Sequence, residues 1–98
     1  MITLRIEHAI SDYDVWQQAF DSFAPARAKA GVRGFIIRQP THDPKYLTLD
    51  LEFDTQGQAE SFAQFLHDRV WSTPTASPAL AGRPQTTILN LRRREDRS

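Results

Sequence analysis

The sequence predicts an α+β domain in which strands and helices follow one another in the order β-α-β-β-α-β. The clearest strand is residues 46–53, where leucine or phenylalanine alternates with more polar side chains, because only a strand sends successive side chains to opposite faces. The clearest helix is residues 13–23, where aromatic side chains recur at intervals of three and four residues and so share one face. A T-x-x-Q capping box at Thr55 predicts the start of a second helix.

The first strand is predicted over residues 2–10, where apolar and polar side chains alternate. His8 occupies a position on the apolar face of this strand, which is unusual for a side chain that titrates near neutral pH. Ser11 and Asp14 follow with the spacing of a capping box, and acidic side chains there suit the positive end of a helix. We therefore expect the first helix to begin at this box.

Proline and glycine mark the end of the first helix. Pro25 is expected to interrupt it, because an internal proline removes a backbone hydrogen bond. The helical pattern resumes over residues 26–30, and Gly31 is a natural C-terminal stop. Residues 33–39 form the second strand, and the turn-forming residues 40–44 join it as a hairpin to the next strand.

The second helix carries an apolar face that extends to Val70. Residues 71–84, rich in small residues and proline, are expected to form a loop, and long loops are often functional. The last strand is predicted over residues 86–91. We therefore expect a single domain at residues 1–92, followed by a charged tail at residues 93–98.

Composition places the chain among ordinary globular proteins. Hydrophobic residues make up 40% of its 98 residues and charged residues 24%, and 12 basic residues balance 12 acidic ones. A net charge of zero provides no general attraction to nucleic acid or to an anionic membrane. The absence of cysteine excludes disulfides, thiolate metal sites and a cysteine nucleophile. No apolar run has the length of a secretory signal core or a membrane span, so we expect a cytoplasmic protein.

This order of elements is the ferredoxin-like arrangement, an antiparallel four-stranded sheet with two helices on one face. RNA-recognition modules share it, and they stack bases on aromatic side chains of the two central strands. Here those strands would present one aromatic residue, Tyr46, together with Glu7, Asp50 and Glu52 on the open face. Because these carboxylates repel phosphates, we expect no nucleic-acid partner.

The chain resembles the dimeric α/β-barrel proteins, in particular the antibiotic biosynthesis monooxygenase-like domains, from residue 2 to about residue 91. The features that carry the resemblance are the strand with His8, residues 12–16 at the start of the first helix, residues 26–35 leading into the second strand, the pair 53–54 followed by 59–62, and the proline- and serine-rich segment before the last strand. In that group two sheets pack open face to open face and close a barrel between protomers. The resemblance implies a homodimer through the open sheet face, with Arg5 and Arg38 pairing across the two-fold axis with Glu7, Asp50 and Glu52.

A candidate site lies between the sheet and the helices, where aromatic residues converge with a few polar ones. Such a cavity is the usual form of a small-molecule site, and we expect it to take a small hydrophobic or aromatic molecule. His8 is the candidate catalytic acid or base, because imidazole titrates near neutral pH. The expected ligand-binding residues are Trp16, Phe20, Phe23, His67 and Trp71.

Each of these residues also has a structural explanation. An aromatic stripe on a helix is more often part of a core than of a binding site. A histidine on an apolar strand face is more often a core residue with a satisfied hydrogen bond than a base. His67 stands near the end of its helix, where an imidazolium is favoured by the helix dipole. The sequence alone leaves both interpretations open.

The resemblance implies a function as well as a fold. Members of that group include cofactor-free monooxygenases and cyclases that act on polyketide aromatics, so the leading hypothesis is a small enzyme of this type without cofactor or metal. Haem-degrading members are disfavoured, because no histidine lies between Trp71 and the last strand to ligate iron. The alternatives are a non-catalytic dimer that binds a small molecule and a structural dimer that makes contacts through its arginine-rich tail.

Overall fold

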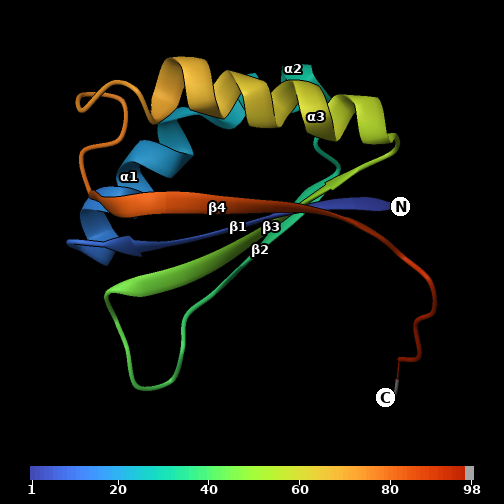
Figure 1. Cartoon of the computed structure of the whole chain (residues 1–98), viewed down its shortest axis with the longest axis horizontal. Coiled ribbons are helices and arrows are strands. Elements are labelled where there is room, and N and C mark those ends of the chain that lie inside the picture. The colour runs from blue at the N-terminus through green and yellow to red at the C-terminus, as the bar shows by residue number, and fades with distance from the viewer. Residues whose placement is uncertain (97–98) are drawn as a thin grey trace.

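Four antiparallel strands form one sheet in the order β2-β3-β1-β4, and the helices pack on one of its faces (Figure 1). The structure, a computed structural model, describes residues 1–96. The predicted α+β, ferredoxin-like fold is confirmed. Its elements are, in chain order, β1 (Ile2–Ile10), α1 (Tyr13–Ser22), α2 (Ala24–Ala30), β2 (Gly34–Arg38), β3 (Tyr46–Phe53), α3 (Gln56–Phe65), the π-helical turn η1 (Leu66–Val70) and β4 (Leu80–Asn90).

A break at Phe23 separates α1 from α2. Pro25 stands in the first turn of α2, where its missing N–H group is not needed. Gly31 ends α2 with a φ of 90°, a left-handed value that glycine adopts without a steric penalty. The interruption and the stop predicted from proline and glycine are therefore both confirmed.

The first helix begins one residue later than the predicted capping box. Asp12 is its N-cap, and the Asp12 carboxylate accepts a hydrogen bond from the backbone N–H of Val15 at 2.9 Å. The prediction of Ser11 as the cap is wrong, because an N-cap side chain must reach the second or third backbone N–H of the helix. From a helix that starts at Tyr13, only Asp12 meets that requirement.

β4 begins at Leu80, although the glycine and proline that follow predicted a loop. Its register with β1 shifts on either side of His8, so residues 82–84 lie opposite that histidine. This bulge contains Gly82, whose φ is 80°. Pro84 is tolerated because β4 is an edge strand, where a residue without an N–H breaks no interior ladder. The predicted loop is therefore shorter, and a bulge lies beside His8.

The core lies between the sheet and the helices. Leu4 and Phe53, from the two central strands, have no exposed surface, and burying side chains of this size contributes about 1.5–3 kcal/mol each. The remaining members are Ile6, Ile10, Leu47, Leu49 and Leu51 from the sheet and Phe20, Ala59 and Phe62 from the helices. The alternating leucines of β3 therefore face the helices, as their spacing predicted.

The pairing of β2 with β3 determines which side of β2 faces the helices. Phe35 pairs with Leu51, a core residue, whereas Ile36 pairs with Asp50 on the open face. Phe35 accordingly contacts the ring of Phe20 edge-on, with the ring centres 4.9 Å apart. The sequence had left this orientation open.

The open face of the sheet carries an ion-pair network centred on Asp50. Arg5 donates two hydrogen bonds to this carboxylate, both 2.8 Å long, and Arg38 adds a third at 3.2 Å. The two arginines cover Asp50 so well that it is only 5% exposed, and they hold its pKa below the ordinary value. Within one chain Asp50 is thus already paired with both arginines, and their predicted pairing across a two-fold axis stays a prediction.

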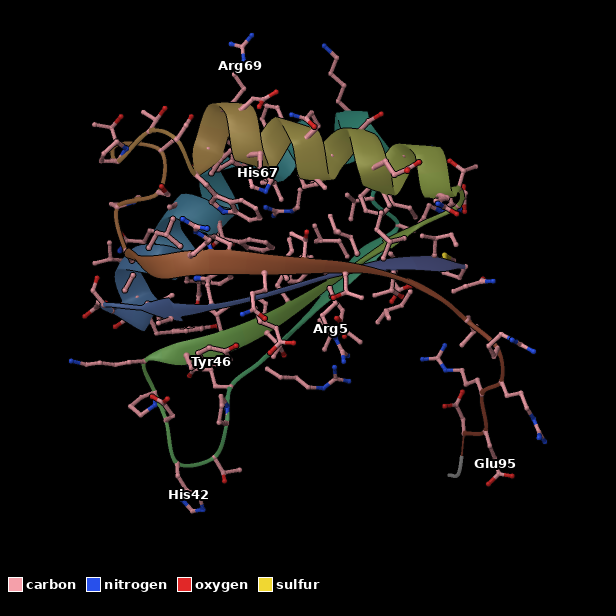
Figure 2. All side chains as sticks on the ribbon, viewed as in Figure 1. Arg5, His42, Tyr46, His67, Arg69 and Glu95 are labelled. Carbon is pink, nitrogen blue, oxygen red and sulfur yellow. The ribbon has the colours of Figure 1, made fainter. Side chains whose placement is uncertain are left out.

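Two further contacts tie the acidic residues of this face to their neighbours. Thr3 donates to the Glu52 carboxylate at 2.8 Å, and the Tyr46 hydroxyl donates to Glu7 at 3.0 Å. The bond to Glu7 also raises the pKa of Tyr46. Figure 2 shows Arg5 and Tyr46 on the side of the sheet away from the helices. The open face is therefore a polar surface whose charges are largely satisfied within the chain.

After β4 the chain runs away from the sheet on the side opposite the helices (Figure 1). Residues 93–96, the described part of the predicted charged tail, form neither helix nor strand. Arg97 and Ser98, the rest of that tail, lie outside the described residues. Within residues 1–96, no helix combines the length and the apolar character needed to cross a membrane.

Candidate functional site

A cavity opens between the sheet and the helices. It contains about 640 Å³ of space between atoms, including its opening to solvent. One water occupies about 30 Å³ in the liquid, so the cavity has room for a larger guest. Its wall is built from β1, β3, α1, α2, α3, η1 and residues 76–80.

The cavity brings together five of the six residues predicted for the site. These residues are His8, Trp16, Phe20, Phe23 and Trp71. His67 does not line the cavity. It is exposed, and its ring meets the ring of Trp71 edge-on with the centres 5.3 Å apart, so His67 supports a wall residue from outside.

His8 reaches the cavity from β1, opposite the bulge in β4. Its Nδ1 lies 2.9 Å from the backbone oxygen of Ala9. Because a carbonyl oxygen can only accept, Nδ1 carries the hydrogen and Nε2 of the neutral ring keeps a lone pair. Burial lowers the pKa of His8 below 6.5, and the bond to Ala9 only partly opposes this shift. His8 is therefore a neutral acceptor at neutral pH.

A row of rings leads from His8 along α1. The ring centres of His8 and Trp16 are 6.3 Å apart, and Trp16 stacks on Phe20 at 5.1 Å. Trp16 and Phe20 are four residues apart in a helix, which places them one above the other on the same face. This row forms a flat aromatic wall, as expected for a site that accepts a planar molecule.

The turn η1 shapes the opposite wall. The predicted helix does extend to Val70, but its last five residues form a π-helical turn, in which the Trp71 N–H donates to the Leu66 oxygen at 2.8 Å. Leu66, Val70 and Trp71, which lie in or directly after this turn, all reach the cavity. Single π-turns within helices occur frequently at functional sites.

The sequence interpretation missed Arg27, which lies in α2 and lines the cavity. Its guanidinium carbon is 3.7 Å from the centre of the Phe20 ring and 5.4 Å from that of Phe35, and Nη1 donates to the Phe20 backbone oxygen. Arg27 is only 8% exposed. Burial lowers its pKa, and the negative charge of Asp21 opposes this shift.

A signal for Arg27 was present in the helical periodicity. The aromatic stripe Trp16, Phe20 and Phe23 continues at the next interval of four to Arg27. A charged residue is normally assigned to the surface, and Pro25 suggested that the stripe had ended. The two helices follow one another closely enough for the stripe to continue, so the cavity has a cation at one end of its aromatic row and a neutral imidazole at the other.

The described residues offer no evident metal centre. Within residues 1–96, no three side chains among histidine, aspartate and glutamate cluster in a way that would hold a metal ion. Besides the indoles of Trp16 and Trp71, the polar side chains that line the cavity are His8, Arg27 and Ser77. The Ser77 hydroxyl lies within hydrogen-bond distance of the backbone oxygens of Val70 in η1 and of Thr73. The arrangement is suited to binding a flat molecule and to moving a proton at Nε2 of His8.

No protein-family model matches the chain, and no curated protein sequence shows a significant match to it. Similarity is found among solved structures. A protein named as a candidate antibiotic biosynthesis monooxygenase from Bordetella bronchiseptica superposes with a TM-score of 0.70 at 15% identity, covering 92% of this chain and 95% of that one. Another with the same description, from Nitrosomonas europaea, has a TM-score of 0.62 at 18% identity, covering 90% and 88%.

A protein described as dimeric and ferredoxin-like, from an uncultured marine organism, superposes with a TM-score of 0.62 at 8% identity. The superposition covers 99% of this chain and 100% of that one. Identities this low establish similarity of fold only. The chain therefore has the fold of the antibiotic biosynthesis monooxygenase domains and of dimeric ferredoxin-like proteins, as the resemblance in its sequence implied.

Proposed function

We propose that the protein is a homodimer that binds a small aromatic molecule in the cavity and acts on it as a cofactor-independent monooxygenase or cyclase, with His8 as acid or base. The observation that carries the proposal is the position of His8. It is a neutral imidazole with its Nδ1 hydrogen engaged by Ala9, and it lines an aromatic cavity. A base poised in this way next to a flat binding wall is a common arrangement for proton transfer.

The chemical step that this geometry favours is removal of a proton from the substrate. The Nε2 lone pair of His8 takes a proton from a phenolic hydroxyl or an activated C–H group, which leaves an imidazolium and a substrate anion. The bond from Nδ1–H to the Ala9 oxygen keeps Nε2 as the accepting atom, because it fixes the tautomer. Oxygenation and cyclisation both start from such an anion, so this step is common to the two reactions proposed.

A non-catalytic binding protein is the second candidate. The observation in its favour is that the wall is almost entirely apolar and aromatic, so Trp16, Phe20 and Trp71 would hold a planar ligand without any reaction. The two candidates differ in what they require of His8. Catalysis needs Nε2 of His8 to exchange a proton, whereas binding needs only the shape of the cavity.

The test compares His8→Gln with His67→Gln, a matched change at a histidine that does not line the cavity. NMR would follow the histidine and tryptophan resonances while phenols and flat aromatic acids are added, and mass spectrometry would detect products under air and under argon. We expect ligands to shift His8 and Trp16, and turnover to be lost only in His8→Gln. Binding that survives in both variants with no product in any sample would favour the non-catalytic candidate. No shift at either residue would refute the cavity as a binding site.

The homodimer is proposed through the open face of the sheet. Dimeric proteins of the same fold support it, and so do apolar side chains on that face. Ile36 on β2 is 41% exposed and Leu89 on β4 is 37% exposed, which places apolar surface on both sides of the network around Asp50. Burying these side chains against a second sheet would remove them from water.

A measurement of mass in solution tests the homodimer. Sedimentation equilibrium of the purified protein should give twice the chain mass of 11.2 kDa. Ile36→Glu should shift the protein toward the monomer, since it adds a charge at the interface. Val15→Glu is the control, because Val15 is 42% exposed but lies on α1, away from the open face. A wild-type protein of single-chain mass, or equal weakening by both changes, would refute the interface.

A further inference from the structure

We propose that the ligand of the cavity is a small aromatic carboxylate whose carboxylate group binds to Arg27. This inference rests on the proposed function, because it names the class of molecule that the cavity takes. It starts from a charged side chain that is 92% buried, since Arg27 is 8% exposed. Burying a guanidinium is unfavourable unless an anion or hydrogen-bond acceptors compensate for the lost water.

The rings of Phe20 and Phe35 stabilise this charge in part, but the described residues place no anion beside it. No carboxylate within residues 1–96 lies within ion-pair distance of Arg27, whereas Arg5, Arg33, Arg38 and Arg94 each have one. Asp21 acts on the charge of Arg27 only at longer range. The one acceptor that the described residues offer is the backbone oxygen of Phe20, which binds Nη1. The positive charge therefore lacks a direct counter-ion in the described chain.

The donors that remain on Arg27 have the geometry a carboxylate requires. Guanidinium has five N–H groups, and neither Nε nor Nη2 has an acceptor among the described residues. No fully buried side-chain nitrogen in residues 1–96 lacks a partner, so these unpaired donors retain some access to solvent. Arg27 lines the cavity, so a guest there approaches the side chain that carries these donors. Nε–H and one Nη2–H form the side-on fork that binds both oxygens of a carboxylate.

The residues around Arg27 indicate what the ligand carries besides its carboxylate group. The guanidinium lies on the face of Phe20, and Phe20 stacks on Trp16, so a carboxylate at Arg27 would have an aromatic wall beside it. Attraction between opposite charges is stronger in this apolar cavity than in water. A neutral ligand would leave the buried charge without a partner, and a cationic ligand would be repelled. An aromatic acid is the class that satisfies both the charge and the wall.

Arg27 also has a structural role that the test must separate from ligand binding. Its bond to the Phe20 oxygen and its stacking on that ring tie α2 to α1. This role uses Nη1 and the flat face of the guanidinium, whereas the proposed carboxylate would use Nε and Nη2. Loss of the structural role would weaken the binding of all ligands alike, whereas loss of a carboxylate site would weaken only the binding of ligands that carry the negative charge.

The experiment therefore uses pairs of probes with the same shape and different charge. Benzoate is compared with benzamide, and 2-naphthoate with 2-naphthamide, by NMR titration of the full chain near neutral pH. We expect each acid to bind the wild-type protein about tenfold or more tightly than its amide, because hydrogen bonds between two charged groups are about twice as strong as those to a neutral acceptor. In Arg27→Met, which keeps the length and apolar stem of the side chain, the two should bind about equally, with the affinity of the amide little changed.

Two further variants complete the design. Arg33→Met is the matched control, because Arg33 is exposed and lies outside the cavity, and it should keep the full preference for the acid. Arg27→Lys keeps the charge without the fork, so it should bind the acid in preference to the amide, but less strongly than the wild-type protein does. This variant tests the site even if Arg27→Met does not fold. Equal binding of acid and amide to the wild-type protein would overturn the carboxylate site while leaving the proposed function intact. Failure of all probes to shift His8 or Trp16 would overturn both.

Discussion

The ion-pair network on the open face allows a quantitative test of how burial strengthens a salt bridge. Asp50 has a side chain only 7% exposed and receives two hydrogen bonds of 2.8 Å from Arg5. Exposed pairs contribute about 0–1 kcal/mol, and breaking a fully buried pair costs about 3–5 kcal/mol. In the single chain Arg5 is 40% exposed and regains water when its partner is removed, so we expect a coupling energy of about 1–2 kcal/mol between the two side chains, and a larger one where a second copy covers the open face.

The assay is a double-mutant cycle of Arg5→Met and Asp50→Asn, with stability measured by urea unfolding at one fixed chain concentration. The pair Arg33 and Asp54 provides a matched control in the same chain. Its charged atoms are 3.8 Å apart and its side chains are 64% and 55% exposed, so its coupling should be below about 0.5 kcal/mol. Equal coupling energies for the two pairs would refute the argument from burial.

The same cycle has a defined pH dependence. Arg5 lowers the pKa of Asp50 below the unfolded value of 3.8, so the folded state releases the proton of Asp50 more readily than the unfolded state does. The stabilisation is therefore fully present above that unfolded value and is lost as the pH falls through the lower, folded pKa. The coupling energy should stay constant from about pH 8 to about pH 5. A decrease within that range would show that another group controls it.

Three further predictions concern stability. Gly31→Ala should destabilise the protein by about 1–2 kcal/mol. The reason is that φ is 90° at this position and a new Cβ would lie 2.6 Å from Nε2 of Gln58. An unchanged urea midpoint would contradict this prediction. Gly57→Ala, in α3 with nothing within 4 Å of its new Cβ, should stabilise it by about 0.5–1 kcal/mol in the same assay. Burial holds the pKa of His8 below 6.5, so the unfolded state binds more protons than the folded state. The free energy of unfolding should therefore fall as the pH drops below 6.5. In His8→Gln the part of this decrease that comes from His8 should be absent.

Local patterns were sufficient to predict most of the fold. The observed bounds of β1 and β3 equal the predicted ranges 2–10 and 46–53, because a period of two is visible in the sequence without knowledge of neighbouring strands. The capping box at Thr55 forms as predicted, with both of its hydrogen bonds present. Each of these features depends on residues only a few positions apart, so the sequence contains all the information they need.

Features that depend on distant residues were less predictable. The start of β4 at Leu80 depends on pairing with β1 and on a bulge that accommodates Gly82, and neither is visible locally. His67 misses the cavity because the face of α3 and η1 that lines it follows the interval Phe62, Leu66 and Val70, and His67 lies outside that stripe. Arg27 was overlooked because its burial depends on the rings of α1 and β2. The same long-range packing decides which side chains form the site.

The two outer strands of the sheet also limit how copies of the chain can associate. β4 carries a bulge and Pro84, which has no N–H to offer to an added strand, and β2 spans only five residues, Gly34–Arg38. Short, interrupted margins of this kind discourage a sheet from growing by strand addition into aggregates. Addition of a strand is therefore disfavoured at both edges of the sheet, whereas association through the open face of the sheet is not hindered by these features.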